Sequence, residues 1–201
     1  MTMLVKNGVF CAPSGLKVKG QSYQKLEDAA DMLRPKLPTM RGVPFKLDCI
    51  SIFEVTLPLA GYNYRTVEID EIDDCAAFTI PEEKVVVLRD DVYAKLHANH
   101  VFGRSTVVHE LSHLALAHHL TLHRGAVLGQ HKFYEDSEWQ AKALTAALMM
   151  PKEAALVAKS PRELAELCGT SVESATYRIK TLVKLNLLPA NHSLWECLPE
   201  Q

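Results

Sequence analysis

Hydrophobic and polar residues recur with two different periods along this chain, and the first clear period is helical. Residues 22–34 place four apolar side chains on one side of a helix. Ser22 precedes them, and serine is a preferred residue at helix N-termini. The pattern predicts a helix over 22–34, which ends where Pro35 and later prolines interrupt the chain.

The middle of the chain changes to short apolar stretches rich in β-branched residues. Pro58, Gly61 and Pro81 separate these stretches. The pattern predicts strands over 47–52, 66–69, 77–80 and 84–88. We therefore expect a small twisted sheet. The last of these strands is either an edge along which an extended peptide binds or a buried central strand.

From residue 91 the period becomes helical again. The predicted helices cover about 91–99, 103–120, 136–150, 161–168 and 171–186. Gly125 and Gly129 mark the connection between the second and third of these helices. A small sheet combined with several helices predicts an α+β fold.

Composition narrows the class of protein. The 201 residues include 22 basic and 24 acidic side chains, which excludes a uniformly basic nucleic-acid-coating protein. The sequence has no apolar run long enough for a membrane span and no secretory signal. Its five cysteines form no C-x-x-C pair, which argues against a disulfide framework or a cysteine zinc site. These features predict a cytoplasmic protein.

Eight of the nine histidines lie between residues 97 and 131, and two of them form a motif. His109 and His113 flank Glu110 in an H-E-x-x-H sequence. On a helix, this spacing places both imidazoles on one side, within reach of one metal ion. The apolar residues around the motif fall on the opposite side of the helix, as expected for a helix lining a cleft.

A catalytic zinc ion needs a third protein ligand. His119 would fit a metzincin pattern, but that pattern needs a glycine where this chain has Leu116. Glu138 follows His113 at a distance that permits a loop and a returning helix, although spacing leaves Glu135 open as well. The other histidines in the cluster match no metal motif, and we expect them to be structural or surface residues: His97, His100, His118 and His123.

Two segments resemble the ImmA/IrrE family of zinc metallopeptidases. They are FGRSTVVHELSH over 102–113 and EWQAKALTAALMMP over 138–151, and the similarity extends over roughly 75–185. The resemblance implies that His109, His113 and Glu138 bind zinc and that Glu110 is the catalytic base. It also implies a zincin-like minimal peptidase fold over 1–152, followed by a helical appendage over 153–201.

The same resemblance implies a class of substrate. Members of this family cleave regulatory proteins, typically a helix-turn-helix repressor of a mobile element, prophage or stress regulon. We therefore expect zinc-assisted hydrolysis of a protein substrate. An additional donor to the oxyanion is expected from the loop before Glu138, where Tyr134 and His131 are candidates.

Four positions depart from the family pattern. Ser112 replaces glycine, Leu144 and Thr145 replace phenylalanine and alanine, and Lys142 replaces aspartate or asparagine. An acceptor at position 142 would orient a ligand histidine, whereas lysine only donates hydrogen bonds. Either another group such as Asp136 supplies the acceptor, or the protein is a weak or inactive peptidase that senses or binds a repressor.

The C-terminal segment 161–182 has the spacing of a helix-turn-helix, with Gly169 in the turn and Ser171 before the second helix. A DNA-binding helix pair carries many basic residues. Residues 160–184 hold four basic and three acidic side chains, which is too small an excess for strong phosphate contacts. We expect a helical appendage packed on the peptidase, with a DNA-binding regulator as the disfavoured alternative.

Overall fold

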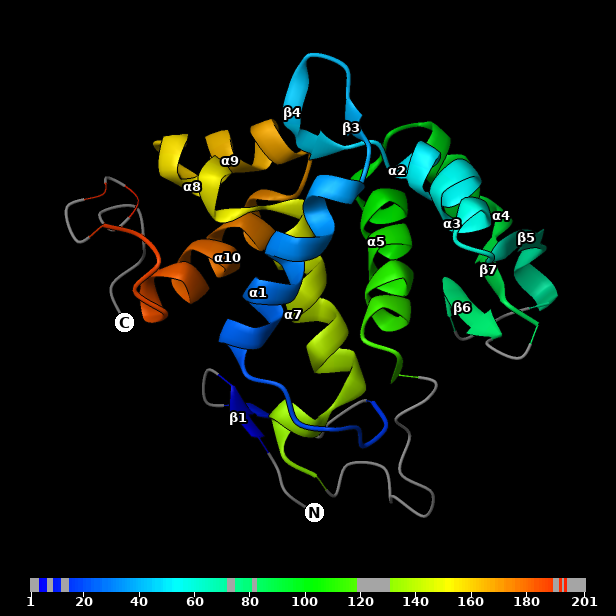
Figure 1. The fold of residues 1–201 in the computed structure, drawn as a ribbon, viewed down its shortest axis with the longest axis horizontal. Coiled ribbons are helices and arrows are strands. Elements are labelled where there is room, and N and C mark those ends of the chain that lie inside the picture. Colours follow the sequence, from blue (N-terminus) through cyan, green and yellow to red (C-terminus); the bar gives the residue numbers. More distant parts are fainter. Residues whose placement is uncertain are drawn as a thin grey trace.

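The computed structural model describes residues 4–6, 9–11, 15–71, 75–80, 83–118, 131–189, 192 and 194. Three helices run side by side through its centre: α1 (Tyr23–Leu33), α5 (Val101–Ala115) and α7 (Ser137–Met149). The small sheet lies beyond α5, and the C-terminal helices lie on the other side of the molecule (Figure 1). The mixed α+β class predicted from the sequence is confirmed.

The central helices begin where their caps predict. The Ser22 hydroxyl accepts a hydrogen bond from the Lys25 backbone at 3.3 Å, and α1 follows directly. Helix α7 begins after Asp136, close to the predicted boundary. Helix α5 ends at Ala115, because Ala117 adopts a left-handed φ of 51°. The prediction of one helix through residue 120 is therefore wrong, and residues 119–130 lie outside the described part.

The predicted small sheet is present. Its strands are β5 (Asn63–Val67), β6 (Ala77–Ile80) and β7 (Val85–Arg89), in the order β5-β7-β6. Strand β7 pairs parallel with β5 and antiparallel with β6, and its central side chains are buried. Of the two alternatives for the last predicted strand, the structure has the buried central one. The edge strand beside α5 is β6.

The predicted strand over 47–52 is wrong. The chain forms β4 (Val43–Leu47) and then turns helical through α2 (Cys49–Ser51), the π-helical η2 (Ile52–Thr56) and α3 (Leu57–Leu59). Asp48 starts this helical segment, since its carboxylate accepts hydrogen bonds from the Ser51 backbone at 3.1 Å and hydroxyl at 2.8 Å. The side chains buried here recur at helical spacing: Cys49, Ile52, Phe53 and Leu57.

Shorter elements connect these parts. They are β1 (Leu4–Lys6), β2 (Val9–Cys11), η1 (Arg34–Lys36), β3 (Thr39–Met40), η3 (Ile69–Glu71), α4 (Asp90–His97) and η4 (Phe133–Glu135). Strands β1 and β2 form one antiparallel hairpin, and β3 pairs antiparallel with β4. In the part of the chain that the structure describes, no helix is both long enough and apolar enough to cross a bilayer.

The C-terminal helices are α8 (Lys152–Val157), α9 (Pro161–Cys168) and α10 (Val172–Lys184). Sequence reasoning predicted the last two but not α8. The buried side chains of α9 and α10 belong to the same hydrophobic core as those of α5 and α7. Arg178 of α10 forms a buried ion pair with Glu27 of α1 and donates to the Met150 carbonyl at 2.8 Å. The described residues of the predicted appendage therefore pack against the central helices.

Candidate metal centre

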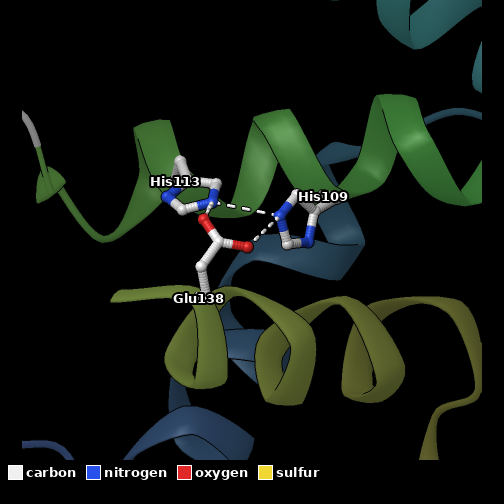
Figure 2. Close-up of side chains that lie close together, drawn as sticks. All are labelled: His109, His113 and Glu138. Carbon is white, nitrogen blue, oxygen red and sulfur yellow. Dashed lines mark hydrogen bonds and ion pairs between the residues drawn. The ribbon is translucent and has the colours of Figure 1, made fainter. Parts of the chain in front are cut away.

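Three of the predicted site residues meet between α5 and α7. The Nε2 atoms of His109 and His113 lie 3.1 Å apart. The two carboxylate oxygens of Glu138 lie 3.2 Å from His109 Nε2 and 3.1 Å from His113 Nε2. Figure 2 shows the Glu138 side chain rising from α7 toward both imidazoles of α5. Among the described residues, this is the one cluster of at least three side chains with metal-ligand spacing.

The donor set and its dimensions fit a zinc ion. Two imidazole nitrogens and a carboxylate oxygen are typical ligands of catalytic zinc, at about 2.0–2.2 Å from the metal. Tetrahedral ligands at such distances lie about 3.4 Å from one another. The ligand atoms of the cluster lie within 4.8 Å of one another, and the three closest pairs are near that tetrahedral spacing. Small shifts of the side chains would accommodate the ion.

Asp136 fixes the start of the helix that carries Glu138. Its carboxylate accepts hydrogen bonds from the Trp139 backbone at 2.8 Å and from the Gly15 backbone at 2.9 Å, and lies 3.0 Å from His131 Nε2. Asp136 and His131 are both buried. The described hydrogen bonds of Asp136 cap the N-terminus of α7 and hold the segment at Gly15. None of them is with a ligand histidine.

The group next to His113 is instead His118. The Nδ1 atoms of the two imidazoles lie 2.8 Å apart. His118 Nε2 lies 3.2 Å from the Gln140 side-chain oxygen, and the Gln140 amide donates to the backbone carbonyls of Lys19 and Tyr134 at 2.9 and 2.7 Å. Burial lowers the pKa of His118 to about 4, so its imidazole is neutral near pH 7 and can accept a hydrogen bond. Sequence reasoning missed this contact because it treated α5 as extending past residue 117.

Glu110 lies next to the ligands and is 7% exposed. Thr79 of the edge strand β6 donates a hydrogen bond from its hydroxyl to the Glu110 carboxylate at 3.0 Å. Burial raises the pKa of Glu110, while the neighbouring imidazoles and Thr79 oppose that shift. Hydrogen bonds from His109 and His113 lower the pKa of Glu138. Thr79 belongs to no motif, so the sequence offered no signal for its contact with Glu110.

The cluster opens into a cleft of about 1030 Å³, which we call the metal cleft. Its wall is formed by Tyr23, Cys75, Ala76, Ala77, Val101, Phe102, Ser105, Thr106, His109, Glu110, Glu138, Trp139, Lys142, Ala143, Thr145, Ala146, Met149, Met150, Thr170, Ser174, Tyr177, Arg178 and Thr181. Helices α5 and α7 supply most of the wall, and α10 contributes four of the residues. Lys142 is exposed within it.

The two candidate oxyanion donors lie outside the described wall of this cleft. His131 is buried beside Asp136. The Tyr134 ring faces Gly20 and the Lys132 ammonium, which lies 5.6 Å from the ring centroid. Glu135, the alternative third ligand, accepts a hydrogen bond from the Lys132 backbone at 3.1 Å and takes no part in the described cluster.

Two other histidines of the histidine-rich segment 97–131 have structural contacts. His97 lies 2.9 Å from a carboxylate oxygen of Glu54. His100 caps α5, where its Nδ1 accepts a hydrogen bond from the Phe102 backbone at 3.2 Å. His119 and His123 lie outside the described residues.

Two departures from the family pattern contact each other. The hydroxyls of Ser112 on α5 and Thr145 on α7 lie 3.0 Å apart, and Ser112 also donates to the Val108 carbonyl at 2.7 Å. The Ser112 side chain is fully buried. This hydrogen bond joins the two ligand-bearing helices next to the metal centre.

Comparison with known proteins agrees with this geometry. Residues 102–180 match the family Peptidase_M78, described as an IrrE N-terminal-like domain. This match supports the resemblance of the chain to the ImmA/IrrE family. The matched segment holds all three clustered ligands, Glu110 and the helices up to most of α10.

A solved structure of a Mycobacterium tuberculosis transcriptional regulator has a similar fold, with a TM-score of 0.53 and 14% sequence identity. The similarity covers 85% of the present chain and 49% of that chain, so the present chain spans about half the length of its structural neighbour. No curated protein matches the sequence.

Proposed function

We propose that this chain is a zinc-dependent endopeptidase with a zincin-like minimal fold. The observation that carries the proposal is the approach of three ligand atoms from His109, His113 and Glu138 beside the buried Glu110. Two histidines and one glutamate leave one position free in a four-coordinate site, as catalytic zinc requires. The site lies in an open cleft, which gives a protein substrate access.

Different residues of the site have different roles in the proposed peptide hydrolysis. Bound zinc supplies Lewis acidity, which polarises the scissile carbonyl and acidifies the attacking water. Glu110 accepts the proton of that water and delivers it to the leaving amine. Thr79 orients the Glu110 carboxylate, and His118 orients the His113 ring.

The sheet provides a place for the substrate backbone. Strand β6 is at the edge of the sheet, and its first residue, Ala77, lines the metal cleft together with the preceding Ala76. An extended peptide that pairs with an exposed strand edge gains backbone hydrogen bonds. Such a peptide at β6 would pass in front of Glu110, because Thr79 of the same strand touches that carboxylate.

The substrate that we propose is a helix-turn-helix repressor of a mobile element, prophage or stress regulon. The family resemblance supports this class. The solved structure with a similar fold is that of a transcriptional regulator. At 14% sequence identity, this similarity concerns the fold alone, so the choice of substrate rests on the family resemblance.

The test combines metal analysis and cleavage. Purified protein should bind about one zinc ion per chain, and His109→Ala should abolish that binding. A helix-turn-helix repressor encoded beside the gene for this chain should be cleaved by the zinc-loaded wild type and remain intact with Glu110→Gln. An intact repressor, together with an intact proteome-derived peptide library, would exclude the peptidase function.

Lys142 supports a second candidate function, a pseudo-peptidase that binds a repressor without cleaving it. The lysine occupies the position where the family pattern has an acceptor. The His118 contact weighs against this candidate, because it gives His113 a partner from a different position. Co-purification of an uncleaved repressor with the zinc-loaded wild type would favour the pseudo-peptidase.

A DNA-binding role for the C-terminal helices has less support. Arg178, one of the four basic residues counted there, is 3% exposed and paired with Glu27. The three basic residues left are balanced by three acidic ones. Salt-dependent retardation of DNA that Lys180→Glu weakens would revive this role.

A further inference from the structure

Lys142 has a position that the proposed hydrolysis leaves unexplained. It lies on α7 one turn after Glu138, and its exposed side chain forms part of the metal-cleft wall. Four residues along a helix correspond to a rise of about 6 Å, so Lys142 follows Glu138 by that distance along α7.

The charges around Lys142 leave its ammonium without a counterion in the described structure. Its Nζ has no described carboxylate within 4 Å, and Glu138 directs both oxygens to the ligand histidines. Arg178, the other basic residue of the wall, is neutralised by Glu27. Within the described wall, Lys142 is therefore the cation that is not held in an ion pair.

The surroundings of Lys142 in the cleft are largely apolar. Trp139 and Ala143 flank it on α7, and Phe102 of α5 is 44% exposed in the same wall. The exposed Lys142 ammonium is accessible to a charged group of a bound peptide. An acidic side chain on a bound peptide would supply the missing counterion.

We propose that Lys142 selects substrates with an aspartate or glutamate two or three residues from the scissile bond. An extended peptide advances about 3.3 Å per residue, so two residues cover the rise between Glu138 and Lys142. The proposal rests on the proposed peptidase function and names a specificity residue for it. It also gives a reason for lysine at this position, since a donor there recognises the substrate while His118 contacts the ligand imidazole.

The experiment compares cleavage preferences. Zinc-loaded wild type, Lys142→Met and Lys142→Glu are incubated with a proteome-derived peptide library, and the new termini are sequenced by mass spectrometry. Wild-type cleavage sites should be enriched in Asp and Glu within three residues of the cut. Lys142→Met should lose about tenfold in preference for acidic peptides, and Lys142→Glu should prefer Lys and Arg.

Two controls keep the result specific. Lys36→Glu makes the same charge change on an exposed lysine that is absent from the described cleft wall, and its preference should equal that of the wild type. Zinc content should equal that of the wild type in every variant, which shows that the ligands remain in place. Identical preferences for the wild type and Lys142→Glu would overturn the proposal.

Binding separates this proposal from the peptidase function. Zinc-loaded Glu110→Gln is titrated with fluorescent acidic, neutral and basic peptides of equal length, and anisotropy is measured at two salt concentrations. Lys142-dependent preference for the acidic peptide without any cleavage by the wild type would retain the role of Lys142 and reject the peptidase. Cleavage by the wild type with no preference for acidic peptides in either assay would retain the peptidase function and reject the role of Lys142.

Discussion

His113 and His118 lie with their Nδ1 atoms 2.8 Å apart, on either side of the point where α5 ends. One imidazole is a proposed metal ligand through its opposite nitrogen, and the other is buried against Gln140. A hydrogen bond to the second nitrogen of a ligand histidine fixes both the tautomer and the orientation of its ring. The partner that orients His113 therefore comes from outside the H-E-x-x-H motif.

Removing this contact should weaken metal binding. His118→Leu is expected to lower zinc affinity by about tenfold to a hundredfold, because the His113 ring loses its partner. Competition with a chromogenic chelator measures the change. His118→Asn is the matched control, since its amide places a polar atom near the position of Nδ1 and should retain more of the affinity. Equal zinc affinity for His118→Leu and the wild type would show that the contact has no such role.

The buried ion pair between Arg178 and Glu27 should be important for stability. Arg178→Met leaves the Glu27 carboxylate in the interior without its partner, and we expect a loss of about 3–5 kcal/mol in the free energy of unfolding. Denaturant titration followed by circular dichroism measures this loss. Lys152→Met, which breaks the exposed pair with Asp31, should change stability by less than about 1 kcal/mol. Similar losses for both variants would contradict the interpretation.

Two buried thiols predict a loss of stability at alkaline pH. Burial raises the pKa of Cys49 and of Cys168 to about 11, above their ordinary value of 9.0. Between these values the unfolded chain releases the thiol protons and the folded chain keeps them, so stability falls as pH rises. Each thiol contributes up to about 1.4 kcal/mol per pH unit in this window.

Denaturant titrations between pH 8 and 11 measure this slope. The double variant Cys49→Ala, Cys168→Ala should have a shallower slope than the wild type, whatever its absolute stability. Alkylation at pH 8 followed by peptide mapping offers an independent check, because half-buried Cys75 in the cleft wall should react well before Cys49 and Cys168. Equal slopes for both proteins would contradict the burial of the two thiols.

The sequence predicted those features that local spacing determines. His109 and His113 are four residues apart on a helix, so their common face needs no knowledge of the tertiary structure. The choice of Glu138 over Glu135 was different, since spacing left both open and only the family resemblance favoured Glu138. In the structure Glu135 turns back to the Lys132 backbone, a contact within its own turn.

Features that depend on tertiary contacts were missed. Thr79 reaches Glu110 because β6 packs beside α5, and no local pattern marks that threonine. The β-branched residues near Ile50 suggested a strand, but the Asp48 cap and the burial of Ile52 and Phe53 favour a helical segment. In this segment, the helix cap and packing against the core outweigh the strand propensity of the β-branched residues.

The hydroxyl pair of Ser112 and Thr145 makes the two positions unequal partners at the interface between α5 and α7. Without Ser112, the Thr145 hydroxyl would keep only its contact with the Val108 carbonyl, which is long at 3.5 Å. Without Thr145, the Ser112 hydroxyl would still donate to that carbonyl at 2.7 Å. The effects of Ser112→Ala and Thr145→Ala on stability are therefore expected to be non-additive, with the serine the less dependent of the two.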